Sequence, residues 1–146
     1  MSERGSTACV HATVVMIDGR GVMLVGPSGA GKSDLALRLI DRGAVLVSDD
    51  YTDLSSASGT LTASPPANIA GRIEIRGLGI VEQAFAASTT IEMVVSLDHE
   101  VDRMPEPQWR TIAGVRVREI VIDPHRHSAP IKVEHALRRI REGHDL

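Results

Sequence analysis

One octapeptide constrains the fold of this chain more than any other segment. In nucleoside triphosphate-binding proteins, a loop with the pattern G-x-x-x-x-G-K-S joins a buried strand to a helix, and its backbone N–H groups surround phosphate oxygens. The pattern therefore predicts an α/β fold with a phosphate site at a helix N-terminus. The residues of the loop, called the P-loop from here on, are Gly26, Pro27, Ser28, Gly29, Ala30, Gly31, Lys32 and Ser33.

The segments on either side of the P-loop have the required character. An apolar run at residues 22–25 predicts the preceding strand. In residues 34–42, Leu35, Leu39 and Ile40 share one helical face, and Gly43 follows where a helix C-cap belongs. The alternative interpretation, a glycine-rich turn that binds no nucleotide, does not explain this order of strand, loop and helix.

We expect all eight P-loop residues to bind ATP. The glycines allow the backbone N–H groups to turn toward phosphate oxygens. Lys32 is expected to bridge the β- and γ-phosphates, and the Ser33 hydroxyl is expected to be a ligand of Mg²⁺.

Two adjacent carboxylates, Asp49 and Asp50, end the next apolar segment. A right-handed crossover from the strand at residues 22–25 to a strand at residues 44–47 predicts that the two strands are parallel and close together. Both aspartates are therefore candidate metal ligands, with one holding Mg²⁺ and the other accepting a proton from an attacking hydroxyl. The alternative is an Asp-rich turn before Tyr51.

The remaining pattern predicts a single P-loop domain over residues 1–146 with a central mixed β-sheet. The P-loop helix covers one face, and the strands of the second half are mainly antiparallel. The charged strip at residues 98–107, with two prolines, predicts an exposed loop. The pattern does not predict the order of the strands. Expected strands are residues 8–17, which form a hairpin with 22–25, then 54–56, 60–63, 72–76, 90–97, 111–112 and 115–122, followed by a helix at 131–141.

Composition excludes several classes of function. Cys9 is the single cysteine, which rules out an internal disulfide and a cysteine-built metal site. A net charge of -3 and one each of Phe, Trp and Tyr disfavour nucleic-acid binding. Neither a signal-peptide pattern nor an apolar stretch of membrane-spanning length is found, so we expect a cytoplasmic protein that does not bind membranes.

Four segments together resemble the HPr kinase/phosphorylase family, over about residues 8–82. The resemblance implies an α/β fold of the HPr kinase / PEP carboxykinase type. It also implies an ATP- and Mg²⁺-dependent serine kinase of the phosphotransferase system that phosphorylates an HPr-like phosphocarrier protein, with the reverse dephosphorylation as a second activity. The segments are Val10 and His11, the P-loop, the run Val47, Ser48, Asp49, Asp50, and the string Ile73, Glu74, Ile75, Arg76, Gly77, Leu78, Gly79, Ile80.

The same resemblance assigns roles to individual residues. His11 and Asp50 are similar to the family's acid/base pair, with Asp49 beside them, and Glu74 and Arg76 to polar residues of its active site. Elementary chemistry agrees, because an aspartate that accepts a seryl proton can return one in the reverse reaction. A lone histidine in a strand is otherwise more often structural. Gly77 and Gly79 predict either a close backbone approach or a β-bulge.

The chain departs from the family pattern at four places. Its match begins near residue 8, so we expect a short form without the family's N-terminal domain, and the sequence does not decide between a monomer and a small homo-oligomer. Pro27 and Asp34 replace an acidic residue and a glutamate. Residues 125–130, which include His125 and His127, stand where the family has a P-G-R-N type signature, and we predict a polar surface loop there rather than a metal site.

Two other functions fit the same motifs. A small-molecule kinase or phosphatase on this scaffold is one, because fold and phosphate site do not determine the acceptor. A nucleotide-binding regulatory module without catalysis is the other. The presence of Lys32, Ser33, Asp49 and Asp50 argues against the second.

Overall fold

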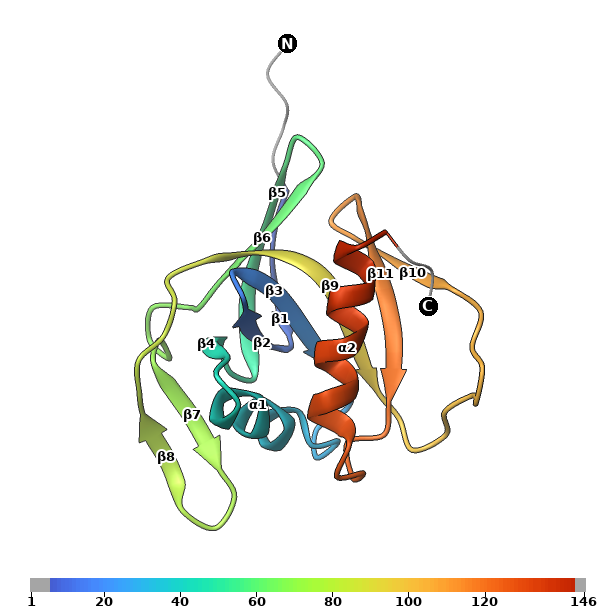
Figure 1. The fold of residues 1–146 in the computed structure, drawn as a ribbon. Helices are drawn as coiled ribbons and strands as arrows, with labels where there is room; N and C mark the ends of the chain where they lie inside the picture. The colour runs from blue at the N-terminus through green and yellow to red at the C-terminus, as the bar shows by residue number, and fades with distance from the viewer. Residues whose placement is uncertain (1–5, 144–146) are drawn as a thin grey trace.

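The computed structural model describes residues 6–143, which form a curled nine-stranded sheet, a separate two-stranded sheet and two helices (Figure 1). No helix among these residues has both the length and the apolar character needed to cross a membrane. The elements are β1 (Ser6–His11), β2 (Thr13–Ile17), β3 (Arg20–Val25), α1 (Lys32–Asp41), β4 (Val45–Ser48), β5 (Tyr51–Ala57), β6 (Thr60–Ser64), β7 (Arg72–Ile75), β8 (Gly79–Glu82), β9 (Thr89–Leu97), β10 (Gln108–Ile112), β11 (Val115–Ile122) and α2 (Ala129–Arg141).

Strand β9 is the centre of the large sheet. One of its edges pairs in parallel with β3, and the other pairs first with β6, antiparallel, and then with β11, parallel. The path through the sheet is β1-β5-β6-β9-β3-β2-β4, with β10 added beyond β11. Because β5–β6, β6–β9, β7–β8 and β10–β11 are all antiparallel, the predicted mixed sheet with a mainly antiparallel second half is confirmed.

The central strands of the sheet have a hydrophobic core on each face, and their side chains alternate between the two cores. In β3, Val22 and Leu24 belong to the core that faces α1 and α2, whereas Met23 belongs to the core on the opposite side. Both helices lie on the same face of the sheet (Figure 1). From α1 the helical core receives Leu35, Ala36 and Leu39, the face that the sequence periodicity predicts.

One prediction about the first strands is wrong. Residues 8–17 form two strands rather than one, because the chain changes partners at Ala12: β1 pairs with β5, whereas β2 pairs with β3 and β4. Strand β4 is parallel and close to β3, as predicted, but it is not the direct neighbour of β3. It runs parallel to β3 but is one strand removed, because β2 lies between them and is antiparallel to both. The β2–β3 hairpin itself agrees with the prediction.

The segment of residues 72–82 forms a hairpin that the sequence pattern did not predict. Strand β8 pairs with β7, and Gly77 and Gly79 lie at the turn with φ of 89° and 102°. These glycines therefore make a tight turn rather than a bulge. The hairpin stands beside α1, apart from the large sheet (Figure 1). Residues 98–107 form the expected exposed connection between β9 and β10.

Candidate active site

The P-loop lies between β3 and α1, beside the central strand of the sheet. Gly31 is the N-cap of α1 and has φ of 102°, and Gly29 has φ of 82°. Other residues adopt this left-handed backbone only at a cost of about 1–2 kcal/mol. The glycines at these two positions are therefore required by the conformation of the loop. At these two positions the backbone of the loop carries no side chain.

Lys32, the first residue of α1, lies against the P-loop and is only 6% exposed. Its Nζ donates hydrogen bonds to the carbonyl oxygens of Gly26, at 2.7 Å, and Pro27, at 3.1 Å. Burial lowers the pKa of Lys32 below its usual 10.5, while the negative charges of Asp50 and Asp49 act in the opposite direction. The ammonium group is thus held inside the loop within reach of both carboxylates' charge.

Asp49 joins three parts of the chain and is 6% exposed. Its Oδ1 accepts hydrogen bonds from the Ser33 hydroxyl, at 2.6 Å, and from the Thr13 hydroxyl, at 3.0 Å. Its Oδ2 accepts the backbone N–H of Glu74 at 3.0 Å. Three donors converging on one carboxylate suit a charged aspartate, which only accepts. Asp49 therefore connects the P-loop helix, β2 and β7 at a single point.

Asp50 makes a different contact from its neighbour. One of its carboxylate oxygens, Oδ1, lies 2.7 Å from Nε2 of His11, and the two side chains are 56% and 34% exposed. The His11 ring in turn lies beside the ring of Tyr51, with centroids 5.3 Å apart. The structure therefore separates the two carboxylates, one buried against the P-loop serine and one accessible and paired with a histidine.

Glu74 and Arg76 are placed differently from the aspartates. Glu74 contributes its backbone N–H to Asp49, while its side chain is exposed on β7. Arg76 is exposed and follows directly after β7, at the start of the hairpin turn. The contact of this segment with the aspartate pair is thus made by the main chain of Glu74.

The oxygen atoms of this site fit a magnesium ion bound together with phosphates. Ser33 and Asp49 offer a hydroxyl and a carboxylate, and Asp50 adds a second carboxylate close by. Within residues 6–143, no group of three or more His, Cys, Asp and Glu side chains could hold a metal ion. Mg²⁺ does not need such a group, because it is usually held by one or two carboxylates plus substrate phosphates. The positive-φ glycines and Lys32 fit the phosphates themselves.

Sequence reasoning did not single out Thr13, although its hydroxyl contacts the aspartate pair. The available signal was its spacing, because a residue two positions after His11 in an extended chain lies on the same face. Nothing in the sequence around Asp49 indicates that its carboxylate accepts a hydrogen bond from a second hydroxyl besides that of Ser33.

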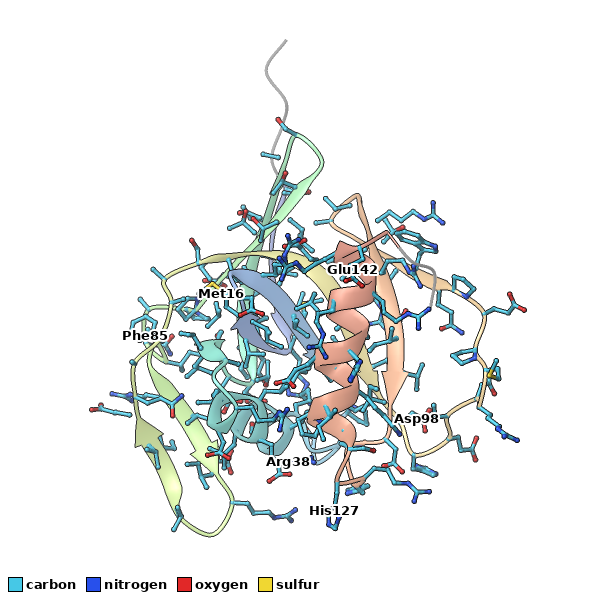
Figure 2. All side chains as sticks on the ribbon, viewed as in Figure 1. Met16, Arg38, Phe85, Asp98, His127 and Glu142 are labelled. Carbon is cyan, nitrogen blue, oxygen red and sulfur yellow. The ribbon has the colours of Figure 1, made fainter. Side chains whose placement is uncertain are left out.

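Arg38 was also missed. Its guanidinium donates to the carbonyl oxygens of Pro124 and Arg126, and so ties α1 to the turn before α2. That turn lies against the P-loop, since a Cβ added to Gly31 would be 3.5 Å from Pro124. Figure 2 shows Arg38 and His127 at the same edge of the molecule. No sequence pattern signals these contacts, because the acceptors are backbone atoms of a distant segment.

Comparisons of this chain with known proteins all identify similarity to the same family. The family model described as HPr Serine kinase C-terminal domain matches residues 3–146. An HPr kinase/phosphorylase of Clostridium tetani is 36% identical over 137 residues, which are 84% of this chain and 45% of that protein. One of Caldicellulosiruptor bescii is 37% identical over 126 residues, 77% of this chain and 40% of that protein. The chain spans less than half the length of these relatives.

A solved structure, that of the Hpr(Ser) kinase/phosphatase from Coxiella burnetii, superimposes with a TM-score of 0.81. The two chains are 30% identical, and the match covers 93% of this chain and 97% of the other. The likeness therefore extends beyond residues 8–82, over which the motifs alone carried it.

Proposed function

The chain belongs to the HPr serine kinase C-terminal domain family, and from this premise we propose that it transfers the γ-phosphoryl group of ATP to a serine hydroxyl of an HPr-like phosphocarrier protein. The observation that carries the proposal is the division between the two carboxylates. Asp49 is tied to the P-loop serine, whereas Asp50 is accessible and tied to His11. A phosphotransferase needs both arrangements, one for binding the phosphates' metal and one for the attacking hydroxyl.

The binding half of the site consists of the P-loop, Lys32, Ser33 and Asp49. Backbone N–H groups of the loop and the Lys32 ammonium bind the β- and γ-phosphates. Ser33 and Asp49 hold Mg²⁺, which when bound neutralises the charge on the phosphates. Asp50, although a candidate metal ligand by sequence, has its Oδ1 paired with His11 and is better placed for proton transfer.

The chemical half consists of Asp50 and His11. The seryl oxygen of the acceptor bonds to the γ-phosphorus as the bond from that phosphorus to the bridging oxygen breaks, and ADP leaves. Asp50 accepts the seryl proton. His11 donates its Nε2–H to Asp50 and holds the carboxylate toward the acceptor. In the dephosphorylation, an oxygen of phosphate bonds to the phosphorus of the phosphoserine as the bond from that phosphorus to the seryl oxygen breaks. Asp50 accepts the proton of the attacking phosphate and returns a proton to the seryl oxygen, so that serine and pyrophosphate leave.

The side chains of Glu74 and Arg76 are exposed, and the segment that carries them contacts Asp49 through the Glu74 backbone N–H. We assign these side chains to contacts with the acceptor protein. A cytoplasmic location, a monomer or small homo-oligomer, and the lack of nucleic-acid and membrane partners remain predictions from the sequence.

The test is phosphate transfer from labelled ATP and Mg²⁺ to a purified HPr-like phosphocarrier. Label is expected on one serine, and replacing that serine by alanine, Lys32→Ala or Asp50→Asn should each abolish it. Matched controls are Lys132→Ala, which alters the chain's only other lysine, and Asp41→Asn at the exposed end of α1. Both controls should keep wild-type transfer.

The opposite results distinguish the other functions. Tight ATP binding that Lys32→Ala abolishes, with no transfer to the phosphocarrier but turnover with a small alcohol or phosphate ester, would indicate a small-molecule kinase or phosphatase. Binding without any turnover would indicate a regulatory nucleotide-binding module. Either result would overturn the proposed protein kinase.

A further inference from the structure

The two segments that carry the histidine and the aspartates run antiparallel, but the ladder between them is interrupted. On one side of the break β1 pairs with β5 as far as His11, and on the other β2 pairs with β4 from Val14. Within residues 6–143, neither the β1–β5 pairing nor the β2–β4 pairing includes residues 12–13 of the first segment or residues 49–50 of the second. The candidate catalytic aspartates therefore stand in a gap between the two ladders. The chain around them is held there by a backbone bond within the turn, from the Tyr51 N–H to the Asp49 carbonyl, rather than by cross-strand pairing.

The side chain of Thr13 bridges this break. It is completely buried, and its hydroxyl donates to Asp49 Oδ1 at 3.0 Å and accepts from the backbone N–H of Asp50 at 3.1 Å. Because an N–H group only donates, the hydroxyl oxygen must accept there, and its single proton is left for Asp49. One hydroxyl thus fixes the side chain of the first aspartate and the main chain of the second.

The bond to Asp50 matters because the backbone of that residue is strained. Asp50 has φ of 70°, in the left-handed region that costs a non-glycine residue about 1–2 kcal/mol. This conformation turns two adjacent carboxylates to different partners, Asp49 to the P-loop serine and Asp50 to His11. A conformation of this kind persists only where neighbouring groups hold it.

We propose that Thr13 is a positioning residue that sets the geometry of both aspartates, and that its hydroxyl rather than its bulk does so. The kinetic consequence rests on the proposed kinase function, whereas the geometric one does not. Thr13→Val keeps the branched shape but removes both hydrogen bonds, and Thr13→Ser keeps the hydroxyl. The pair of variants separates the hydroxyl from the space that the side chain fills.

The first measurement is amide hydrogen exchange by NMR on the chain without nucleotide. In Thr13→Val, exchange of the Asp50 N–H should be at least about 10-fold faster, because its acceptor is gone. Thr13→Ser should stay within about threefold of wild type. The Ala86 N–H, which bonds to the Leu46 carbonyl on β4, is the internal control and should not change. Unchanged Asp50 exchange in Thr13→Val would overturn the proposal.

The second measurement is the kinetics of phosphotransfer. Thr13→Val should lower kcat about 10- to 100-fold, the effect of a displacement of about 1 Å, with little change in KM for ATP. Thr13→Ser should recover most of the loss. Equal defects in the two variants, or a rise in KM alone, would refute a positioning role. If the wild-type chain phosphorylates no phosphocarrier protein tested, the proposed function fails, and the exchange measurement still decides the role of Thr13.

Discussion

A double-mutant cycle on His11 and Asp50 tests the chemical half of the site most directly. The variants are Asp50→Asn, which removes the proton acceptor but keeps the shape, His11→Ala, and the two together. If Asp50 accepts the seryl proton and His11 acts only through Asp50, the losses cannot add. His11→Ala should then slow the wild-type enzyme but cost less than about threefold once Asp50 is already Asn.

The magnitudes follow from the exposure of the pair. General-base catalysis contributes about 10²- to 10⁴-fold, so Asp50→Asn should lower kcat by that factor, equal to about 2.7–5.4 kcal/mol of activation free energy. Folding stability should change far less, because an ion pair with side chains 34% and 56% exposed is worth about 1 kcal/mol or less. Even a domain with about 5 kcal/mol of unfolding free energy would remain about 99.9% folded after that loss.

The assay is transfer from labelled ATP to the phosphocarrier at saturating substrates, alongside urea unfolding of each variant. Fully additive losses would show that His11 acts separately from Asp50. Retention of more than about a tenth of kcat in Asp50→Asn would refute proton transfer to this carboxylate. A large fall in unfolding free energy in either single variant would contradict the small structural role that its exposure implies.

Two further predictions concern other parts of the chain. A Cβ at Gly21 would lie 2.5 Å from the carbonyl oxygen of Thr90 on the central strand, so Gly21→Ala should lower the free energy of unfolding, measured in urea, by about 3 kcal/mol. Gly59 has open space around it but φ of 76°, so Gly59→Ala should lower it by about 1 kcal/mol, and equal losses in the two variants would contradict the clash. The pKa of the Cys9 thiol is raised by partial desolvation, by a hydrogen bond to Asp53 and by the negative charge of Asp53, so the rate of Cys9 alkylation should increase with pH through a midpoint above the usual 9.0. Asp53→Asn should lower that midpoint, and an unchanged midpoint would contradict the role of Asp53.

The features that the sequence predicted are those with a local signal. The P-loop and the helix after it follow from spacing within about ten residues, and the aspartates follow from the apolar segment that they end and the handedness of its crossover. The contact between His11 and Asp50 spans 39 positions, and the expectation that they act together came from family resemblance rather than from any pattern.

The remaining features depend on pairing between distant segments. The break at Ala12 leaves no trace in the alternation of side chains, because the residues on both sides remain extended. Strand β8 was missed because it is only four residues long and mostly exposed, so it lacks an apolar face. The central place of β9 was equally hidden, since a buried apolar run shows that a strand has neighbours but does not identify them.

The position of β9 has a consequence for synthesis on the ribosome. The P-loop strand β3 is complete at Val25, yet its neighbour on one edge ends only at Leu97. Roughly 70 residues must therefore be translated in between, which takes roughly 4–14 s at about 5–20 residues per second. Throughout that interval β3 has β2 as its sole large-sheet neighbour, and its open edge is available to other nascent chains. Because the loop that follows β3 is held beside β9, we expect a nascent chain to acquire affinity for ATP only after Leu97 leaves the exit tunnel.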